Sequence, residues 1–425
     1  MDTIFALSSG APPAGIAVIR ISGPGACIAL QTLCGRLPPP RRASRAWLRD
    51  ADGLPLDDGL ALFFPGPRTA TGEDLAELHV HGGRAVVAAV ERTLATMPGL
   101  RRAAPGEFTR RAFANGRIDL AEAEGLADLL AAETELQRRT ALANAGGALS
   151  RKVDGWREAL LQLSAQVEAL LDFDDEDDVD SGQSALVAVR AAALADDLAQ
   201  ALAAPAAEPL REGFRVALAG PPNAGKSTLF NTLLDSDAAI TAPIAGTTRD
   251  VLVHPVAIGG VPFSLVDMAG LRDDSSDAIE AAGIARAAAE IARADLVLWL
   301  GPEGQGPDGA WEIDAQIDRA GHQAKCNPQH RVSAVTGEGM QALRQALVDY
   351  AQARLPKPGD LALNRRQRDL VALAWQDLSA AAEQPDLLVM AEHLRQARLA
   401  FDALLGRTRT EDVLDALFGR FCIGK

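Results

Sequence analysis

The segment Gly220–Ser227 constrains the fold of this chain more than any other part of the sequence. It fits the pattern GxxxxGK[ST], and an apolar run, Val216–Ala219, precedes it. The residues after it, Ser227–Leu234, are typical of a helix. Glycines in such a loop let backbone N–H groups point inward as an anion site, and the helix N-terminus adds its positive dipole end. The order strand, loop, helix predicts a phosphate-binding loop rather than a chance glycine-rich turn.

The chemistry expected of this loop is the binding of a nucleotide triphosphate. Lys226 would reach the β- and γ-phosphates, and the hydroxyl of Ser227 would bind Mg²⁺. The predicted nucleotide-binding residues of the loop are Gly220, Asn223, Ala224, Gly225, Lys226, Ser227 and Thr228.

Two further segments stand where a GTPase needs them. In Gly246–Asp250 a threonine can close over the γ-phosphate and complete the Mg²⁺ shell, and we assign Thr248, next to Thr247. Asp267 ends an apolar run and would hold a water on Mg²⁺, while the Gly270 amide would contact the γ-phosphate.

The residue that orients the attacking water is not the usual one. Ras-like enzymes place a glutamine after the glycine that corresponds to Gly270, and here the residue is Leu271, which cannot hydrogen-bond. Glu280 is the candidate replacement, and its alternative role is a surface glutamate at the start of a helix. On the sequence alone the surface role is favoured for Glu280, and the residues expected to act on the phosphates are Lys226 and Thr248.

The motif that would recognise the base departs from the usual pattern. Guanine is usually bound by an Asn-Lys-x-Asp motif, and the candidate is Ala324–Asn327, with Lys325 and Asn327 as its contacts. An asparagine at 327 presents NH₂ donors to a donor edge of the base, so guanine preference should weaken. Ser333–Gly337 is similar to the SAxTG loop whose backbone touches the base, which adds Ser333 and Ala334.

The chain divides into three regions. Residues 1–118 are predicted to be mixed α/β, with strands at Ile16–Ile21, Leu60–Phe64 and Leu75–Val80. Residues 119–210 and 351–425 are predicted to be helical, and strands and helices alternate over residues 211–350. The simplest architecture inserts a Ras-like P-loop α/β domain into a discontinuous helical domain. The acidic run Asp172–Asp180 is interpreted as a solvated connector rather than a metal site.

Composition excludes several classes of protein. None of the apolar runs approaches the roughly 18 residues of a membrane span, so we expect no membrane partner. Four cysteines among 425 residues indicate no disulfide framework and favour a reducing cytoplasm. A net charge of −15 argues against strong unspecific binding to nucleic acid. If RNA is a partner, local basic patches or another protein must make the contact.

These motifs together resemble the tRNA-modification GTPase family MnmE, also called TrmE, over nearly the whole chain. The most specific pieces are Gly220–Ser227, Ile244–Asp250 and the terminal Phe421–Lys425. In the first region Thr71–Asp74 and Pro105–Phe113 are similar to the family as well. Met268, Ala324 and Asn327 depart from its pattern.

The resemblance implies a fold, an activity and partners. It implies an N-terminal α/β folate-binding domain, residues 1–118, that joins a homodimer; a discontinuous helical domain, residues 119–210 and 351–425; and an inserted G domain, residues 211–350. It implies K⁺-dependent GTP hydrolysis and modification of C5 of the tRNA wobble uridine with an FAD-containing MnmG partner, as a heterotetramer. The one-carbon unit would come from a tetrahydrofolate derivative.

The resemblance also assigns roles by position. Asn223 would bind K⁺ with backbone carbonyls near Ala242 and Ile244 and with Thr247, and Glu280 would orient the attacking water. Arg20, Glu77, Arg117 and Lys425 match folate-contacting positions, and Cys422 lies in the end motif with its role open. His79 and His81 share one strand face, and packing is favoured over zinc binding because further ligands are lacking.

An alternative function belongs to a different class. A GTP-dependent assembly factor or switch would need the phosphate loop but neither a folate pocket nor this C-terminus. Residues 1–118, Cys422 and Lys425 favour the modifying enzyme.

Overall fold

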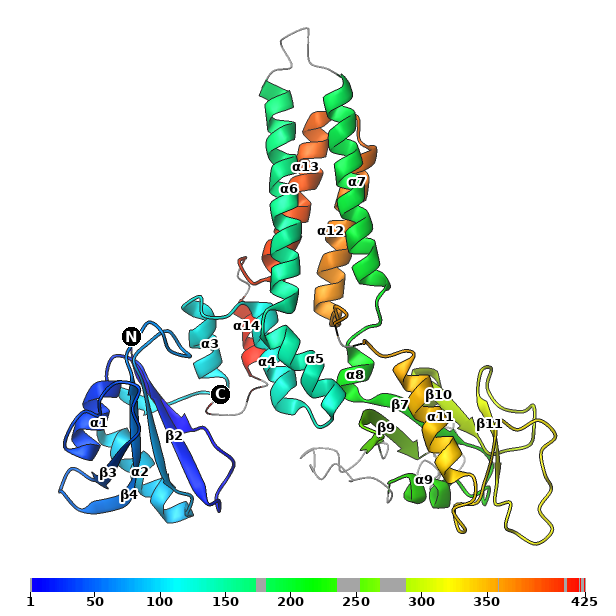
Figure 1. Cartoon of the computed structure of the whole chain (residues 1–425), viewed down its shortest axis with the longest axis horizontal. Coiled ribbons are helices and arrows are strands. Elements are labelled where there is room, and N and C mark those ends of the chain that lie inside the picture. Colours follow the sequence, from blue (N-terminus) through cyan, green and yellow to red (C-terminus); the bar gives the residue numbers. More distant parts are fainter. Residues whose placement is uncertain are drawn as a thin grey trace, which may run out of the picture. The chain divides into compact units, whose positions relative to one another are not determined.

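The computed structural model describes residues 2–172, 181–234, 253–267, 288–357, 359–408, 411–419, 421 and 424 (Figure 1). The chain forms two compact units, one of Met1–Ala127 with Asp402–Lys425 and one of Asp128–Phe401. Each unit has its own sheet. Among the described helices, none combines the length and hydrophobicity needed to cross a membrane.

The first unit contains a six-stranded sheet of order β3-β4-β5-β2-β1-β6. Its strands are β1 (Thr3–Leu7), β2 (Ile16–Ser22), β3 (Ser44–Arg49), β4 (Pro55–Phe64), β5 (Leu75–His81) and β6 (Leu100–Arg102). All neighbouring pairs are antiparallel except β1 and β6. The predicted strands at 16–21, 60–64 and 75–80 are confirmed, and β1, β3 and β6 are additional.

Helices cover the two faces of this sheet unequally. The helices α1 (Ala26–Cys34) and α2 (Arg84–Thr96) pack on one face, where Ile19, Leu30 and Val90 are fully buried. The helix α3 (Glu107–Ala114) brings Phe108 against Ile4 and Ala6 at β1. Because side chains alternate along a strand, Arg20 of β2 and Glu77 of β5 lie on the face opposite to Ile19 and Leu78.

The end of the chain is part of this first unit. Leu414 and Phe418 of α14 (Glu411–Phe418), together with Phe421, pack against Leu120 and Ala123 of α4 (Leu120–Ala131). The hydroxyl of Ser8 donates to the carbonyl of Gly424 at 2.8 Å. Gly424 has φ +95°, and a Cβ there would lie 2.0 Å from the Leu7 carbonyl oxygen, so only glycine fits this approach.

Helices make up much of the second unit. They are α5 (Glu135–Ala145), α6 (Ala148–Asp172), α7 (Ser181–Ala203), α8 (Glu208–Glu212), α9 (Lys226–Leu234), α11 (Met340–Gln352), α12 (Arg365–Glu383) and α13 (Leu387–Leu404). The long helices α6, α7, α12 and α13 run side by side (Figure 1). Trp156 of α6 stacks on Phe401 of α13, with ring centroids 6.0 Å apart. Segments far apart in the sequence thus share one apolar core, as the two separated helical stretches predicted.

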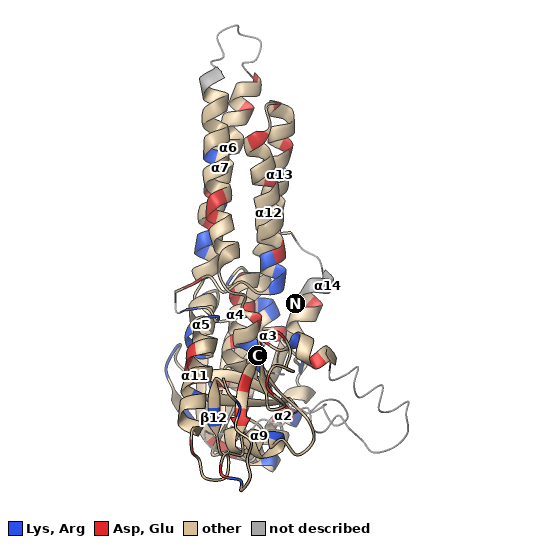
Figure 2. Ribbon diagram, turned by 90° about the vertical axis from the view of Figure 1, so that its right-hand side faces the viewer, with Lys and Arg blue, Asp and Glu red and all other residues tan. Residues whose placement is uncertain are grey.

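Charge on these long helices is mixed. Figure 2 shows acidic and basic residues interspersed along the helices of the bundle rather than gathered in one stripe of a single sign. Three arginines, Arg365, Arg366 and Arg368, begin α12.

Two of the helices begin with capping boxes. Thr134 and Gln137 form the one at α5, and Asn364 and Gln367 form the one at α12.

The second sheet has the order β12-β11-β10-β7-β9-β8. Its strands are β7 (Phe214–Ala219), β8 (Val253–Ile258), β9 (Val261–Asp267), β10 (Leu296–Trp299), β11 (Trp311–Ala315) and β12 (His330–Val332). All pairs are parallel except the hairpin of β8 and β9. Leu229 of α9 and Leu343 of α11 are buried with Leu218 in one core, whereas Ile291 packs against Ala217 in another. A parallel sheet with layers on both faces was predicted; the strand β11 was not.

Candidate functional site

The loop between β7 and α9 has the backbone of a phosphate cradle. Gly220 has φ +149° and Gly225 has φ +91°, and Asn223 between them is a non-glycine residue at φ +62°. A Cβ at Gly220 would lie 3.0 Å from the Gly301 amide nitrogen, and one at Gly225 would lie 3.0 Å from Nε2 of Gln316. The two glycines therefore serve both the turn and the close packing of the loop.

Lys226 lies folded against this loop. Its side chain comes from the first turn of α9, and only 8 % of the residue is exposed. Nζ donates to the carbonyl oxygens of Gly220, at 2.9 Å, and of Pro221, at 2.8 Å. A buried ammonium needs such oxygen partners. The structure thus places Lys226 at the phosphate loop, where its contact with phosphate stays a prediction.

Ser227 and Asp267 meet where the sequence predicted a magnesium site. Asp267 ends β9 and pairs in register with Leu218 of β7, next to the loop. The Ser227 hydroxyl donates to Oδ2 of Asp267 at 3.4 Å. Mg²⁺ prefers oxygen ligands, and a hydroxyl and a carboxylate both supply them. When Mg²⁺ also binds nucleotide phosphates, the protein usually contributes only one or two ligands. The residues therefore fit the ion.

A cavity of about 270 Å³ lies beside the phosphate loop. Two predicted nucleotide-binding residues of the loop region, Gly225 and Thr228, line it, and so does Ala334. Ser333 is fully buried beside Ala334, and its Oγ accepts from the Thr336 amide at 3.0 Å, which fixes the turn. The full lining is Gly225, Thr228, Leu229, Ala315, Gln316, Asp318, Arg319, Val332, Ala334 and Val335.

Lys325 and Asn327 are held elsewhere. Neither is among the described residues that line this cavity. Nζ of Lys325 donates to Oε2 of Glu312 at 2.6 Å and to the Trp299 carbonyl at 3.0 Å. The backbone N–H of Asn327 donates to the carboxylate of Glu303 at 2.8 Å. In these contacts Lys325 serves as the counter-ion of Glu312.

Asp318 is the cavity residue that the sequence analysis missed. It is the third residue after the end of β11. The run Ala315, Gln316, Ile317 and Asp318 matches an Asn-Lys-x-Asp pattern only at its fourth position, the aspartate. Its side chain is exposed. The available signal was the position at the carboxyl end of a parallel strand, where α/β folds bind ligands. Without β11 in the prediction, that signal could not be used.

Gln316 connects the cavity to the phosphate loop. It has φ +59°, an uncommon conformation for a residue with a side chain. Its Nε2 donates to the Asn223 carbonyl at 3.3 Å, and the Arg319 guanidinium donates to its Oε1 at 3.4 Å. Strained backbones persist where the surroundings fix them, commonly at ligand sites.

In the first unit, two of the predicted folate residues are in contact. Nη2 of Arg20 donates to Oε1 of Glu77 at 2.9 Å, and both side chains are partly exposed. Nε2 of His79 lies 3.4 Å from the same carboxylate, and Nδ1 of His81 lies 2.8 Å from Oδ1 of Asp57. Among the described residues no group of three or more His, Cys, Asp or Glu could hold a metal.

Arg117 lines a separate cavity of about 400 Å³ with Phe113, Asp119, Glu122 and Arg407. Its Nε donates to the Thr69 carbonyl at 3.2 Å. In the described part of the chain Arg20 bonds to Glu77 and Arg117 bonds to Thr69, so the predicted folate residues lie in two separate sets of contacts.

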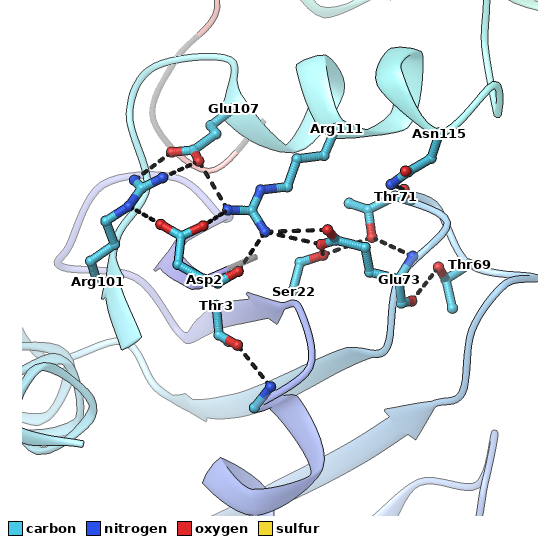
Figure 3. Close-up of polar contacts among 11 residues, drawn as sticks. Asp2, Thr3, Ser22, Thr69, Thr71, Glu73, Arg101, Glu107, Arg111 and Asn115 are labelled. Carbon is cyan, nitrogen blue, oxygen red and sulfur yellow. Dashed lines mark hydrogen bonds and ion pairs between the residues drawn. The ribbon is translucent and has the colours of Figure 1, made fainter. Parts of the chain in front are cut away.

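A charged network joins Glu107 and Arg111 of α3 to Arg101 of β6 and to Asp2, which precedes β1 (Figure 3). Arg111 contacts three carboxylates, those of Asp2 at 2.7 Å, Glu73 at 3.1 Å and Glu107 at 3.2 Å. Arg101 pairs with both Asp2 and Glu107. Burial raises the pKa of Glu107, but hydrogen bonds from Arg101, the Ala104 amide and Arg111 outweigh it and hold that pKa below its usual range.

Replacing Arg111 by methionine should destabilise the first unit by about 3 kcal/mol, because it leaves half-buried carboxylates without their shared cation. Hydrogen exchange of β1 and α3 amides would measure this locally. Arg102→Met is the matched control: Arg102 is 64 % exposed in its pair with Glu91, and its loss should cost under about 1 kcal/mol. Equal protection in the two variants would contradict the prediction. Since the pKa of Glu107 is lowered, its contribution to stability is present at neutral pH and is lost as the pH falls through that lowered pKa.

Several predicted residues lie outside the described part of the chain. They are Ala242, Ile244, Thr247, Thr248, Gly270, Glu280, Cys422 and Lys425.

Comparison with known proteins covers the whole chain. A family model described as the MnmE helical domain matches residues 120–422, and one described as the GTP-binding protein TrmE N-terminus matches residues 3–117. A tRNA modification GTPase MnmE of Erythrobacter litoralis is 63 % identical over 425 residues, covering 100 % of both chains. The protein of that name from Novosphingobium aromaticivorans is 62 % identical over 435 residues, again with 100 % of both chains covered.

A solved structure, the G domain of the T. maritima FeoB iron transporter, matches 32 % of this chain and 98 % of its own at 28 % identity. Its TM-score of 0.23 is too low to support an argument about the fold. The two family models and the full-length relatives are decisive, and the chain belongs to the MnmE family of tRNA modification GTPases.

Proposed function

We propose that this chain binds GTP with Mg²⁺ and couples its hydrolysis to modification of tRNA. The observation that carries the proposal is Lys226, which lies folded on the carbonyls of a left-handed glycine loop beside a cavity of nucleotide-base size. Residues 211–350 act as a G domain inserted between the helical stretches 119–210 and 351–425. Ser227 and Thr248 would hold the Mg²⁺ and Asp267 would hold one of its waters. The bound ion would supply positive charge against the developing phosphate charge.

Asp318 takes the base-reading role that the sequence predicted for Asn327. A carboxylate can accept two hydrogen bonds from the N1–H and the 2-amino group of guanine, and adenine offers no such pair of donors. The exposure of Asp318 at the cavity supports this assignment. The predicted contacts of Ser333 and Ala334 stay, since Ala334 lines the cavity beside the Ser333 turn.

In this proposal a monovalent cation adds positive charge beside the phosphates. Asn223 binds K⁺ together with carbonyls near Ala242 and Ile244 and with Thr247, and Glu280 orients the attacking water. The left-handed backbone of Asn223, φ +62°, is a fixed conformation at the rim of the loop. An ion there supplies the positive charge that an arginine finger supplies in other GTPases.

Replacing Na⁺ by K⁺ should raise GTP turnover at least severalfold, because the cation stabilises charge that develops only in the transition state. Steady-state phosphate release at equal ionic strength measures it, with Asn223→Ala as the variant that should lose the difference between the salts. Equal rates in the two salts for the wild-type chain would refute the role of Asn223.

The first unit supplies the one-carbon chemistry. We propose that residues 1–118, together with Lys425, bind a tetrahydrofolate derivative through Arg20, Glu77, Arg117 and Lys425, and that residues 1–118 join a homodimer. The carboxylate of Glu77 can accept from a pterin ring, and the basic groups suit a glutamate tail. With an FAD-containing MnmG-type partner, the protein modifies C5 of the wobble uridine.

Binding of 5-formyltetrahydrofolate to the full chain tests this assignment. Glu77→Gln should weaken binding about tenfold, since it removes a charge-assisted hydrogen bond. Arg45→Met, which breaks an exposed pair with Asp58 on the edge of the same sheet, should leave binding unchanged. No binding by the wild-type chain would favour a GTP-dependent switch without folate chemistry.

A further inference from the structure

The connection between β11 and β12 lacks the helix that such connections normally contain. The two strands are parallel, with Ile313 opposite His330. Residues 316–329 between them are all described and form neither helix nor strand. A crossover between parallel strands is usually a helix, which packs on the sheet and fixes the loop after the first strand. Something else must hold this loop, which carries Asp318.

A buried carboxylate provides that support. Asp314 is the fourth residue of β11 and is 2 % exposed. Nε2 of His322 donates to its Oδ1 at 2.7 Å, and Nε of Arg331 lies 3.6 Å from its Oδ2. The His322 side chain is 19 % exposed. Burying a carboxylate without partners costs free energy, so loss of this hydrogen bond is unfavourable.

The contact closes a short loop under the cavity. Asp314 and Ala315 are consecutive residues of β11, so their side chains point to opposite faces of the strand, and Ala315 lines the cavity. The backbone turns twice between them and His322: the Arg319 amide donates to the Gln316 carbonyl at 3.0 Å, and the His322 amide donates to the Arg319 carbonyl at 3.1 Å. Asp318 stands at the middle of this closed loop.

The remaining anchors of the crossover hold its later part. Lys325 bonds to Glu312, and the amides of Cys326 and Asn327 bond to Glu303. These contacts lie after His322 in the sequence. They provide a matched control within the same connection.

We propose that His322 is a positioning residue for guanine specificity: by its hydrogen bond to buried Asp314 it holds residues 316–321 so that Asp318 faces the base. This inference rests on the role proposed for Asp318. Without the bond the loop samples more conformations, and binding must then select the competent one, which reduces the apparent affinity by the competent fraction.

A double-mutant cycle tests the proposal with GDP and IDP as the probes, by isothermal titration calorimetry. IDP lacks the 2-amino group, so it forms one fewer bond to an aspartate. His322→Ala should weaken GDP binding about tenfold and IDP binding by less than about threefold. In the Asp318→Ala background, His322→Ala should cause no further loss, because two residues that act through one contact are not additive.

Three comparisons make the outcome decisive. His322→Gln, which keeps a side-chain N–H donor, should recover most of the GDP affinity, and Lys325→Met should leave the ratio of GDP to IDP affinity unchanged. An equal loss from His322→Ala in both backgrounds, or with both nucleotides, would overturn the proposal and make His322 merely structural. If Asp318→Ala itself leaves GDP affinity unchanged, the base-reading role of Asp318 fails, and this inference fails with it. A loss with Asp318→Ala but not with His322→Ala removes the inference alone.

Discussion

Replacing Asp318 by asparagine should lower the affinity for GDP about 100-fold and create affinity for XDP. A hydrogen bond to a charged group contributes about 1.5–3 kcal/mol, and the substitution removes a carboxylate that would accept two such bonds from guanine. Xanthine carries an oxygen where guanine carries its 2-amino group, so the new NH₂ donor of asparagine gains a partner. Competition of GDP and XDP against a fluorescent guanine nucleotide measures both changes.

The matched variant for this prediction is Asn327→Asp. It restores the usual residue at the position that the sequence motif suggested, but the Asn327 amide is bound to Glu303 and the residue does not line the cavity. We expect nucleotide selectivity to stay as in the wild type. A gain of GDP affinity in Asn327→Asp, with Asp318→Asn unchanged, would return the base-reading role to Asn327.

Replacing Lys226 by methionine should slow GTP hydrolysis about 1000-fold. Preorganised cations aimed at developing phosphate charge commonly contribute factors of about 10²–10³ each. Methionine keeps much of the volume of the side chain, so the loop should still form. Single-turnover phosphate release separates the chemical step from binding.

Lys325→Met serves as the control, because Lys325 is also a mostly buried lysine of the same unit, 9 % exposed in its pair with Glu312. Its loss should lower stability while hydrolysis by the folded protein stays within about twofold of wild type. Comparable loss of hydrolysis in both variants would show that the phosphate loop is not the catalytic site.

Much of the fold followed from local patterns in the sequence. The strand before Gly220, the helix after Ser227 and the apolar run that ends at Asp267 each carry a periodicity that one segment displays by itself. The two helical stretches were predicted to share a core, and Trp156 does stack on Phe401. The resemblance to the MnmE family is confirmed by relatives of equal length.

The base-binding site could not be predicted from the sequence because the strand before it, β11, has an unusual composition. In β11, Glu312 and Asp314 occupy two of five positions, so the run lacks the apolar character of a central strand. Both acids have side-chain partners eight or more residues away, His322 for Oδ1 of Asp314 and Lys325 for Glu312. Tertiary pairing of this kind overrides local propensity, and Asp318 could be placed only once β11 was known.

The packing of Phe418, Phe421 and Gly424 onto the first unit has a consequence for biosynthesis. A ribosome releases this chain from its amino end, and domains commonly begin to fold as they emerge. The segment Asp128–Phe401 is complete before translation ends. The unit built on Met1–Ala127 lacks Asp402–Lys425 until residues 128–401 have been synthesised, so Leu120 and Ala123 gain these packing partners late. The amino-terminal part of the nascent polypeptide therefore matures last.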